Sequence, residues 1–251
     1  MPLTYLAHQL AVIPLKAARP RWFDGTALCI GSMAPDFAYA FTGTPLGFGS
    51  HNLRAQLFWS LPVTLLLTRI VRAWLAEPIG AQLPEPYGSQ VRALARSTHA
   101  WFVTVISALV GGVSHVLMDS CTHRHGWGYN HFAWLHVHVS PSWQVADVLQ
   151  YVGHTLGTLL CALLVMRLCA AQCVSSWNGS QQSLTTTERP APWFWSALTL
   201  LAAVCGALAV LVVARGDGIP VAIIRGSYAA FAGLCWIAFS LRREREVALE
   251  P

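Results

Sequence analysis

Apolar residues run along this chain in five long blocks, which polar or charged positions separate. A helix needs about 20 apolar residues to cross the hydrocarbon core of a membrane, and the five blocks reach or approach that length. All five are predicted to be helices, because lipid offers no hydrogen-bond partner to an exposed backbone. The blocks cover Ala55 to Leu75, Ala100 to Met118, Val148 to Leu168, Trp193 to Val213 and Ile219 to Ser240.

The first fifty residues contain two shorter apolar segments, Leu3 to Leu15 and Ala27 to Phe41. Both are too short to span a bilayer, and charged residues lie between them. We therefore expect short re-entrant or interfacial helices that pack against the longer ones. The predicted fold class is an all-α, polytopic integral membrane bundle of about five transmembrane helices plus these short N-terminal helices.

Composition excludes the water-soluble classes. Of the 251 residues, 55% are hydrophobic and only 11% are charged, whereas a soluble domain carries about 25% charged residues. Every basic residue except Lys16 is an arginine, and these arginines flank the apolar blocks instead of clustering on one surface. Membrane lipids are therefore the expected partners, and no nucleic acid is expected. The oligomeric state is left open.

A polar stretch rich in Ser, Thr, Gln and Pro, residues 175–192, predicts a linker. It would divide a motif-bearing membrane domain, residues 1–174, from a C-terminal transmembrane hairpin, residues 193–241. Residues 242–251 are expected to form a solvated tail.

Alternation of the five spans predicts which ends lie together. The start of the first, the end of the second and the start of the third share one face, which we call the motif face. Nine arginines fall on the opposite face, against six basic residues on the motif face, so the positive-inside rule predicts a cytoplasmic C-terminus and an extracytoplasmic motif face. The nine are Arg69, Arg72, Arg92, Arg96, Arg167, Arg189, Arg242, Arg243 and Arg245.

The strongest chemical signal is SHVLMDSCTHRHGW, residues 114–127. His115 and Asp119 are four residues apart and share a helix face, and His123 lies on the same stripe if the helix continues. Imidazole and carboxylate together suit a divalent metal of the zinc type. The alternative is a capping aspartate with two interfacial histidines.

Three more metal-ligand residue types lie on the motif face: His8 in LAHQL, Asp36 in GSMAPDF and His51 in GFGSHNL. Each alone is typical of a structural residue, such as a buried histidine or a turn aspartate. Ionisable groups at membrane depth are costly and favour a functional interpretation. The predicted ligand set for one or two divalent ions, with zinc expected, is His8, Asp36, His51, His115 and Asp119.

Other polar residues near this set receive supporting roles. His123 and His125 are predicted to act as general acid or base. Arg124 is a candidate for contact with an anionic substrate group, although it also suits a lipid anchor. Asp147 and His154, at the start of the third span, are expected to orient the ligand imidazoles. The aromatic stretch 126–143 predicts an interfacial loop, with a lid as the alternative.

The order AH, GSxAPDF, SHxL, SHxxxDSxTHxxGW and LQY, over roughly residues 1–170, resembles a bacterial membrane-protein family, domain of unknown function 4184. More distantly, it is similar to membrane-bound metal-dependent hydrolases of the YdjM type and to zinc-dependent phospholipase C. The resemblance implies a bacterial cytoplasmic membrane, and the distant relatives imply hydrolase chemistry. Two positions depart from the hydrolase pattern: Phe37 replaces a second acidic residue, and His51 lacks an adjoining histidine.

The predicted function is a membrane-embedded, metal-dependent hydrolase acting on a phosphoester or lipid-linked substrate at the membrane interface. Two alternatives stay open: a transporter of protons or metal ions, and a non-catalytic membrane scaffold. A transporter needs polar groups that continue across the bilayer. The fourth and fifth blocks carry no acidic residue and only Arg225, which weighs against such a relay.

Overall fold

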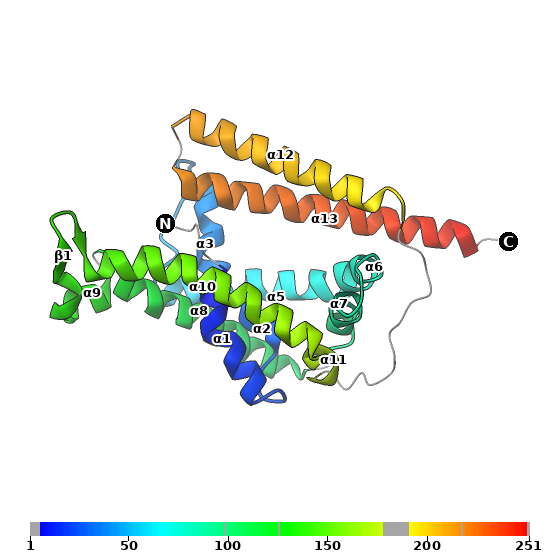
Figure 1. Ribbon diagram of the computed structural model, residues 1–251, viewed down its shortest axis with the longest axis horizontal. Helices are drawn as coiled ribbons and strands as arrows, with labels where there is room; N and C mark the ends of the chain where they lie inside the picture. Colours follow the sequence, from blue (N-terminus) through cyan, green and yellow to red (C-terminus); the bar gives the residue numbers. More distant parts are fainter. Residues whose placement is uncertain (1–5, 98, 125, 178–190, 217, 250–251) are drawn as a thin grey trace. The chain divides into compact units, whose positions relative to one another are not determined.

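The computed structural model describes residues 6–97, 99–124, 126–177, 191–216 and 218–249, and the protein is 78% helical (Figure 1). Five helices are long and apolar enough to cross a membrane, which confirms the predicted all-α class of integral membrane protein. They span Leu53–Gly80, Trp101–Thr122, Val145–Ala170, Phe194–Ala214 and Val221–Val247.

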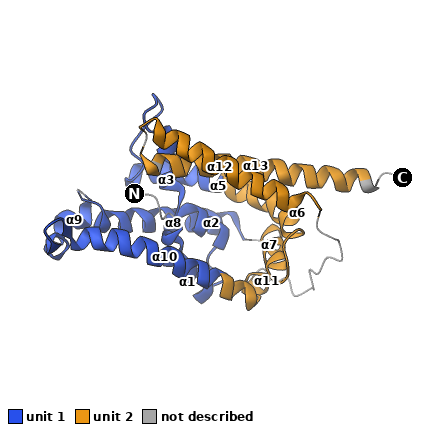
Figure 2. Cartoon of the chain, turned by 45° about the horizontal axis from the view of Figure 1, so that its top comes forward, with its two compact units in different colours: residues 1–65, 99–165 blue, residues 66–98, 166–251 orange. Residues whose placement is uncertain are grey.

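The chain forms two compact units (Figure 2), of which the first comprises residues 1–65 and 99–165. Its elements include three short N-terminal helices, a first span interrupted by π-helical turns, and a small antiparallel hairpin between two long helices. They are α1 (Ala7–Ala18), α2 (Gly25–Gly31), α3 (Ala34–Phe37), η1 (Ala38–Phe41), α4 (Leu53–Ala55), η2 (Gln56–Ser60), α5 (Leu61–Ile70, its first half), α8 (Trp101–Thr122), α9 (Trp127–His131), η4 (Ala133–His136), β1 (His138–Ser140), β2 (Trp143–Gln144) and α10 (Val145–Ala170, most of it).

The second unit comprises residues 66–98 and 166–251. Its core contains Phe194, Ile237 and Leu241, which join the neighbouring helices α12 and α13 (Figure 1). Its elements are η3 (Val71–Leu75), α6 (Ala76–Gly80), α7 (Tyr87–Ala95), α11 (Cys173–Trp177), α12 (Phe194–Ala214) and α13 (Ile219–Leu249). The predicted division into 1–174, 175–192, 193–241 and 242–251 stays a prediction, and residues 178–190 of its linker lie outside the described residues.

Helix α8 is the centre of the first unit, where it contacts α1, α2, α3 and η2. It approaches α2 closely because small residues face each other at the crossing. A Cβ atom on Gly31 would lie 2.5 Å from the Ala108 carbonyl oxygen, and one on Gly111 would lie 2.5 Å from the Leu28 carbonyl oxygen. Only glycine permits such an approach of two backbones, and it brings the end of α2 against α8.

Asp24 joins the start of α2 to α8. Its carboxylate caps the helix by accepting from the Ala27 amide (3.2 Å) and also accepts from the Thr104 hydroxyl (2.7 Å). Its own amide donates to the Ser107 hydroxyl at 2.8 Å. The Asp24 side chain is fully buried, so these hydrogen bonds replace the water that it loses on folding.

We expect Asp24→Ala to lower the free energy of unfolding by about 1–2 kcal/mol, because it removes a helix cap and leaves the Thr104 hydroxyl without this acceptor. Asp24→Asn keeps a capping oxygen and should cost less. Thermal unfolding of both variants in the same detergent checks the prediction. Equal melting temperatures for the alanine variant and the wild type would contradict it.

Candidate metal centre

A short helix and a loop of the first unit position Asp36 and His51. Asp36 lies buried in the single turn of α3, which is held to the first span because the Trp59 indole donates to the Ala34 carbonyl at 3.0 Å. His51 precedes α4, whose cap is Asn52. The Gln56 side chain, at a π-helical turn, donates to the Ser50 carbonyl at 3.1 Å. The backbone on either side of His51 is therefore fixed.

His115 and Asp119 lie one turn apart on α8 and are both buried. The ring of His115 has a defined orientation, because its Nδ1 lies 2.7 Å from the Ser32 carbonyl oxygen. A carbonyl only accepts, so Nδ1 carries the proton and Nε2 presents its lone pair. The Nδ1 atom of His51 lies 3.1 Å from the Ser50 hydroxyl, which permits the same tautomer. Histidine ligands of metals are held by their second nitrogen in this way.

Four ligand atoms converge from these residues. The Nε2 atom of His51 lies 3.2 Å from Asp36 Oδ1, 3.3 Å from Asp119 Oδ2 and 3.2 Å from His115 Nε2. The Nε2 atom of His115 lies 3.5 Å from Asp36 Oδ1 and 3.4 Å from Asp119 Oδ2. A tetrahedral ion with bonds of about 2.0–2.1 Å places its ligand atoms about 3.3–3.4 Å apart. These five distances therefore fit the edges of a zinc-type coordination tetrahedron.

Direct ion pairing between the same side chains explains the geometry less well. Charge-assisted hydrogen bonds from a nitrogen to a carboxylate are about 2.7–2.9 Å long, and each of the four histidine–aspartate distances exceeds that range. If both rings were protonated at Nε2, two positive N–H groups would face each other at 3.2 Å. A cation between lone pairs and carboxylates removes that repulsion.

A second group shares Asp119 with the first. One ligand atom each from His8, Asp119 and His154 lie within 4.8 Å of one another. The Oδ1 atom of Asp119 is buried and accepts no hydrogen bond within the described residues, while His8 Nε2 lies 3.5 Å from it. Asp119 therefore presents one oxygen to each group, as a carboxylate that bridges two ions does.

A close approach of α1 and α10 at one position brings His8 and His154 together. A Cβ atom on Gly157 of α10 would lie 3.0 Å from the Ala7 Cβ atom, so this glycine lets α1 approach. His154 is one helical turn before Gly157 and His8 follows Ala7. The His8 and His154 rings are consequently 5.6 Å apart edge to face, and His8 stacks on His115 at 3.9 Å.

Of the protonation states outside the spans, those of His8 and Asp36 suit ligand roles, whereas a metal ion at His51 has to displace a proton. Burial, reinforced by the His115 ring, lowers the pKa of His8 to about 3, which leaves its imidazole neutral. Burial opposes ionisation of Asp36, but contacts with His115 and His51 outweigh it and hold the pKa of that carboxyl below its usual range. Burial likewise opposes protonation of His51, and the Asp119 and Asp36 carboxylates raise its pKa instead. A neutral imidazole and an ionised carboxylate are the states that bind metals.

Of the two residues predicted to act as acid and base, the structure describes His123 and not His125. Helix α8 ends at Thr122, and His123 is its C-cap instead of a further helical residue. Its Nδ1 atom still lies 3.7 Å from Asp119 Oδ1, and the Gln150 amide donates to its Nε2 at 3.1 Å. Burial lowers the pKa of His123. His125 lies outside the described residues.

Arg124 and Asp147 pair with each other. The guanidinium donates through two nitrogens to the Asp147 carboxylate at 3.1 and 2.6 Å, and this carboxylate also accepts from the Gln144 amide at 2.8 Å. Its hydrogen bonds thus join the hairpin to the start of α10, and no contact within the described residues links it to a ligand imidazole. Of the two residues expected to orient imidazoles, His154 lies in the cluster and Asp147 lies outside it.

We expect Asp147→Asn to leave the metal content of the purified protein unchanged, because its hydrogen bonds reach Arg124 and Gln144 and not the cluster. The Arg124 side chain is exposed, and pairs that face water contribute little to stability, so the melting temperature should hardly change. Elemental analysis of the variant checks the metal content. A loss of metal comparable to that of a cluster variant would show that Asp147 supports the centre.

Sequence reasoning did not find the groups that orient the ligands. Ser32 acts through its backbone carbonyl, which no residue type reveals. Gln56 acts from a π-helical turn inside an apolar block, where a lone amide gave a weak signal. The small residues in GTALCIGS and ALVGG are the sequence feature that indicates a close approach of α2 and α8.

A family model described as Domain of unknown function (DUF4184) matches residues 1–240 of the chain. No curated protein and no solved structure gave a match.

Proposed function

The chain belongs to the family described as Domain of unknown function (DUF4184), and we propose that it is a membrane-embedded, metal-dependent hydrolase. Its substrate would be a phosphoester or a lipid-linked ester at the membrane interface, and its cofactor one or two divalent ions of the zinc type. We place it in a bacterial cytoplasmic membrane, with the cluster on the extracytoplasmic side and the C-terminus in the cytoplasm, as the distribution of arginines favours.

The observation that carries the proposal is the set of five distances between ligand atoms, all from 3.2 to 3.5 Å, among Asp36, His51, His115 and Asp119. These residues come from three elements that are distant in sequence. Without a bound cation, burying two carboxylates beside several imidazoles would cost free energy, because these groups would lose water without gaining a compensating charge.

The two groups would hold one ion each. Asp36, His51, His115 and one oxygen of Asp119 would bind the first, and the other oxygen of Asp119 with His8 and His154 would bind the second. A zinc-type ion bound there makes hydroxide available near neutral pH and, as a Lewis acid, stabilises charge on a phosphoryl oxygen. The second group has only three protein ligands, which leaves room for water or substrate.

His123 is the residue best placed to move a proton. Its lowered pKa favours the neutral imidazole, the form that acts as a general base, and its Nε2 atom, to which Gln150 now donates, is the one that would take up a proton from the attacking water and return it to the departing alcohol. The Gln150 amide lies 3.1 Å from its Nε2 atom and the Thr122 hydroxyl 3.2 Å from its Nδ1 atom, while Asp119 Oδ1 is 3.7 Å from Nδ1. Its side chain is 32% exposed, in contrast to His115 at 0%, so it borders the solvent side of the cluster.

The position of the cluster supports an interfacial substrate. His115 lies seven residues before the end of α8, which is about 10 Å along the helix axis, and His51 lies two residues before the first span. The segment between α8 and α10 exposes Trp127 in α9, Trp134 in η4 and Trp143 in β2, as aromatic residues at headgroup depth do. The order of PD, His and SHxxxD elements, similar to the YdjM-type hydrolases and zinc-dependent phospholipase C, is a second support for hydrolysis.

The test uses the full chain purified in detergent. Zinc-loaded protein should hydrolyse bis(p-nitrophenyl) phosphate, a chelator should abolish this activity, and added zinc should restore it. His115→Ala/Asp119→Ala should bind no metal and be inactive, whereas Asp147→Asn should match the wild type. Wild type with no more metal than the double variant would contradict the metal centre.

Two further measurements separate the alternatives. Zinc-loaded protein that hydrolyses no phosphoester but carries ions into liposomes would favour a transporter. Two results together would favour a purely structural cluster: the wild type contains no metal, and the double variant is less stable than the wild type.

A further inference from the structure

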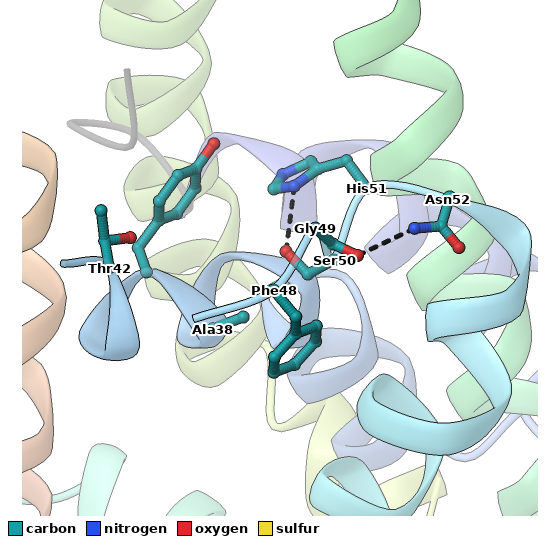
Figure 3. A pocket seen from close by; sticks show the side chains of 8 residues that line it. Ala38, Thr42, Phe48, Gly49, Ser50, His51 and Asn52 are labelled. Carbon is teal, nitrogen blue, oxygen red and sulfur yellow. Dashed lines mark hydrogen bonds between the residues drawn. The ribbon is translucent and has the colours of Figure 1, made fainter. Parts of the chain in front are cut away.

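A cavity of about 250 Å³ lies beside His51, between η1 and the loop that leads to α4 (Figure 3). Its lining runs from the buried residues Ala38 and Ser50 to the exposed residues Thr42 and Asn52. The cavity therefore leads from the surface to a residue of the candidate metal centre. Pockets for drug-sized ligands measure about 300–1,000 Å³, so this cavity suits a smaller group.

The lining is neutral and rich in hydroxyl groups. Besides His51, the residues that the structure places around the cavity include no acidic or basic side chain. Tyr39, Thr42 and Ser50 supply hydroxyls, and Phe48 supplies an apolar face that Figure 3 shows next to the loop. Such a wall can hydrogen-bond a neutral polar group but offers no cation for a second phosphate and no carboxylate for an ammonium group.

Within this wall, Tyr39 is the side chain best suited to select a ligand. Its ring lies 5.5 Å from the His51 ring, and its hydroxyl has no hydrogen-bond partner among the described residues. The hydroxyl is therefore available to donate a hydrogen bond to a ligand. The Asn52 amide, in contrast, is occupied by Gly49 and Ala55.

We propose that this cavity binds the hydroxyl-bearing alcohol group of the substrate, such as a glycerol or sugar headgroup, while the phosphoryl group lies at the metal centre. The proposal rests on the proposed function and names its substrate class. Tyr39 acts as a specificity-determining residue by hydrogen-bonding a headgroup hydroxyl. A site built to bond a hydroxyl discriminates against an analogue without it, because its own polar groups are then left unpaired.

Charge supports the same substrate class. Two aspartates face one or two divalent ions in the loaded centre, so the net charge of ligands and ions beside the cavity is neutral or positive. A neutral or positive centre does not attract a cationic headgroup. A headgroup with a second phosphate would bind the metal ions instead of entering the neutral cavity. A neutral polyol avoids both conflicts.

The test compares two water-soluble lipids of equal charge, dihexanoyl phosphatidylglycerol and dihexanoyl phosphatidylpropanol, which differ only in two headgroup hydroxyls. Their affinities for zinc-loaded protein in detergent are measured by saturation-transfer NMR. Phosphatidylglycerol should bind about tenfold more tightly, and Tyr39→Phe should lower its affinity about three- to tenfold, as one lost neutral hydrogen bond predicts. Tyr151→Phe, on α10 and outside the cavity lining, is the matched control and should change neither affinity.

Equal affinities for the two lipids, no effect of Tyr39→Phe, or no binding of either lipid would overturn the inference. Metal content and hydrolysis, measured on the same samples, test the proposed function separately. Zinc-loaded protein that hydrolyses both lipids equally well and binds them equally would retain the hydrolase proposal and overturn the headgroup cavity. Protein that binds phosphatidylglycerol more tightly but hydrolyses neither lipid would retain the headgroup cavity and overturn the hydrolase proposal.

Discussion

Asp119→Asn is expected to remove both ions of the proposed metal centre and to lower the proposed phosphoester hydrolysis at least about 100-fold. Asp119 directs Oδ2 toward His51 and His115 and Oδ1 toward His8, so it is the one residue shared by both groups of ligands. An amide nitrogen cannot bind zinc and would face imidazole lone pairs. Loss of residues that merely orient ligands costs about 10–100-fold, and loss of a shared ligand should cost at least the upper value.

Asparagine has nearly the same shape as aspartate, so this variant separates metal binding from packing. Metal content and hydrolysis are measured together with those of Asp147→Asn, which makes the same chemical change at a carboxylate that pairs with Arg124. Asp36→Asn should remove one ligand, from the first ion only, and keep part of the metal. If Asp119→Asn retained the wild-type metal content, the shared-ligand arrangement would be wrong.

Gly111→Ala is expected to have the largest effect on stability, although alanine normally stabilises a helix relative to glycine by about 0.5–1 kcal/mol. The new Cβ atom would lie 2.5 Å from the Leu28 carbonyl oxygen and 2.8 Å from the Ser32 amide nitrogen. Both are backbone atoms of α2 and its C-cap, so the two helices must separate. Overpacking costs about 1–3 kcal/mol, and the melting temperature should fall by about 2–12 °C.

The same substitution at Gly206 provides the control, because a Cβ atom there meets nothing within 4 Å. Gly206→Ala should leave the melting temperature unchanged or raise it. Gly111→Ala should also weaken metal binding, since Ser32 supplies the carbonyl that orients His115. A Gly111→Ala protein as stable as the wild type would show that α2 and α8 do not pack as closely as described.

The sequence predicted the spans well because a transmembrane helix is a local property of composition. Blocks of apolar residues identified all five helices, but their ends differ: the first span extends beyond Leu75 to Gly80, with π-helical turns at Gln56–Ser60 and Val71–Leu75. The π-helical turns leave no periodic pattern in the sequence by which they could be predicted.

The candidate site was predictable in part for a topological reason. Alternating spans force the start of one helix beside the end of the next, and this alternation alone predicts that His51 lies near His115 and Asp119. The rotation of α10 about its axis could not be predicted, because it depends on the packing of Gly157 against Ala7. For that reason the sequence predicts only an orienting role for His154, whereas one of its ring nitrogens lies within 4.8 Å of ligand-type atoms of His8 and Asp119.

The most direct test is an anomalous difference map recorded at the zinc absorption edge from crystals of the full chain grown with zinc. We predict one peak bonded to Asp36, His51, His115 and Asp119 at about 2.0–2.2 Å, and a second peak between Asp119, His8 and His154. A map without a peak in contact with the Asp119 carboxylate would contradict the metal centre, and the hydrolase proposal would fall with it.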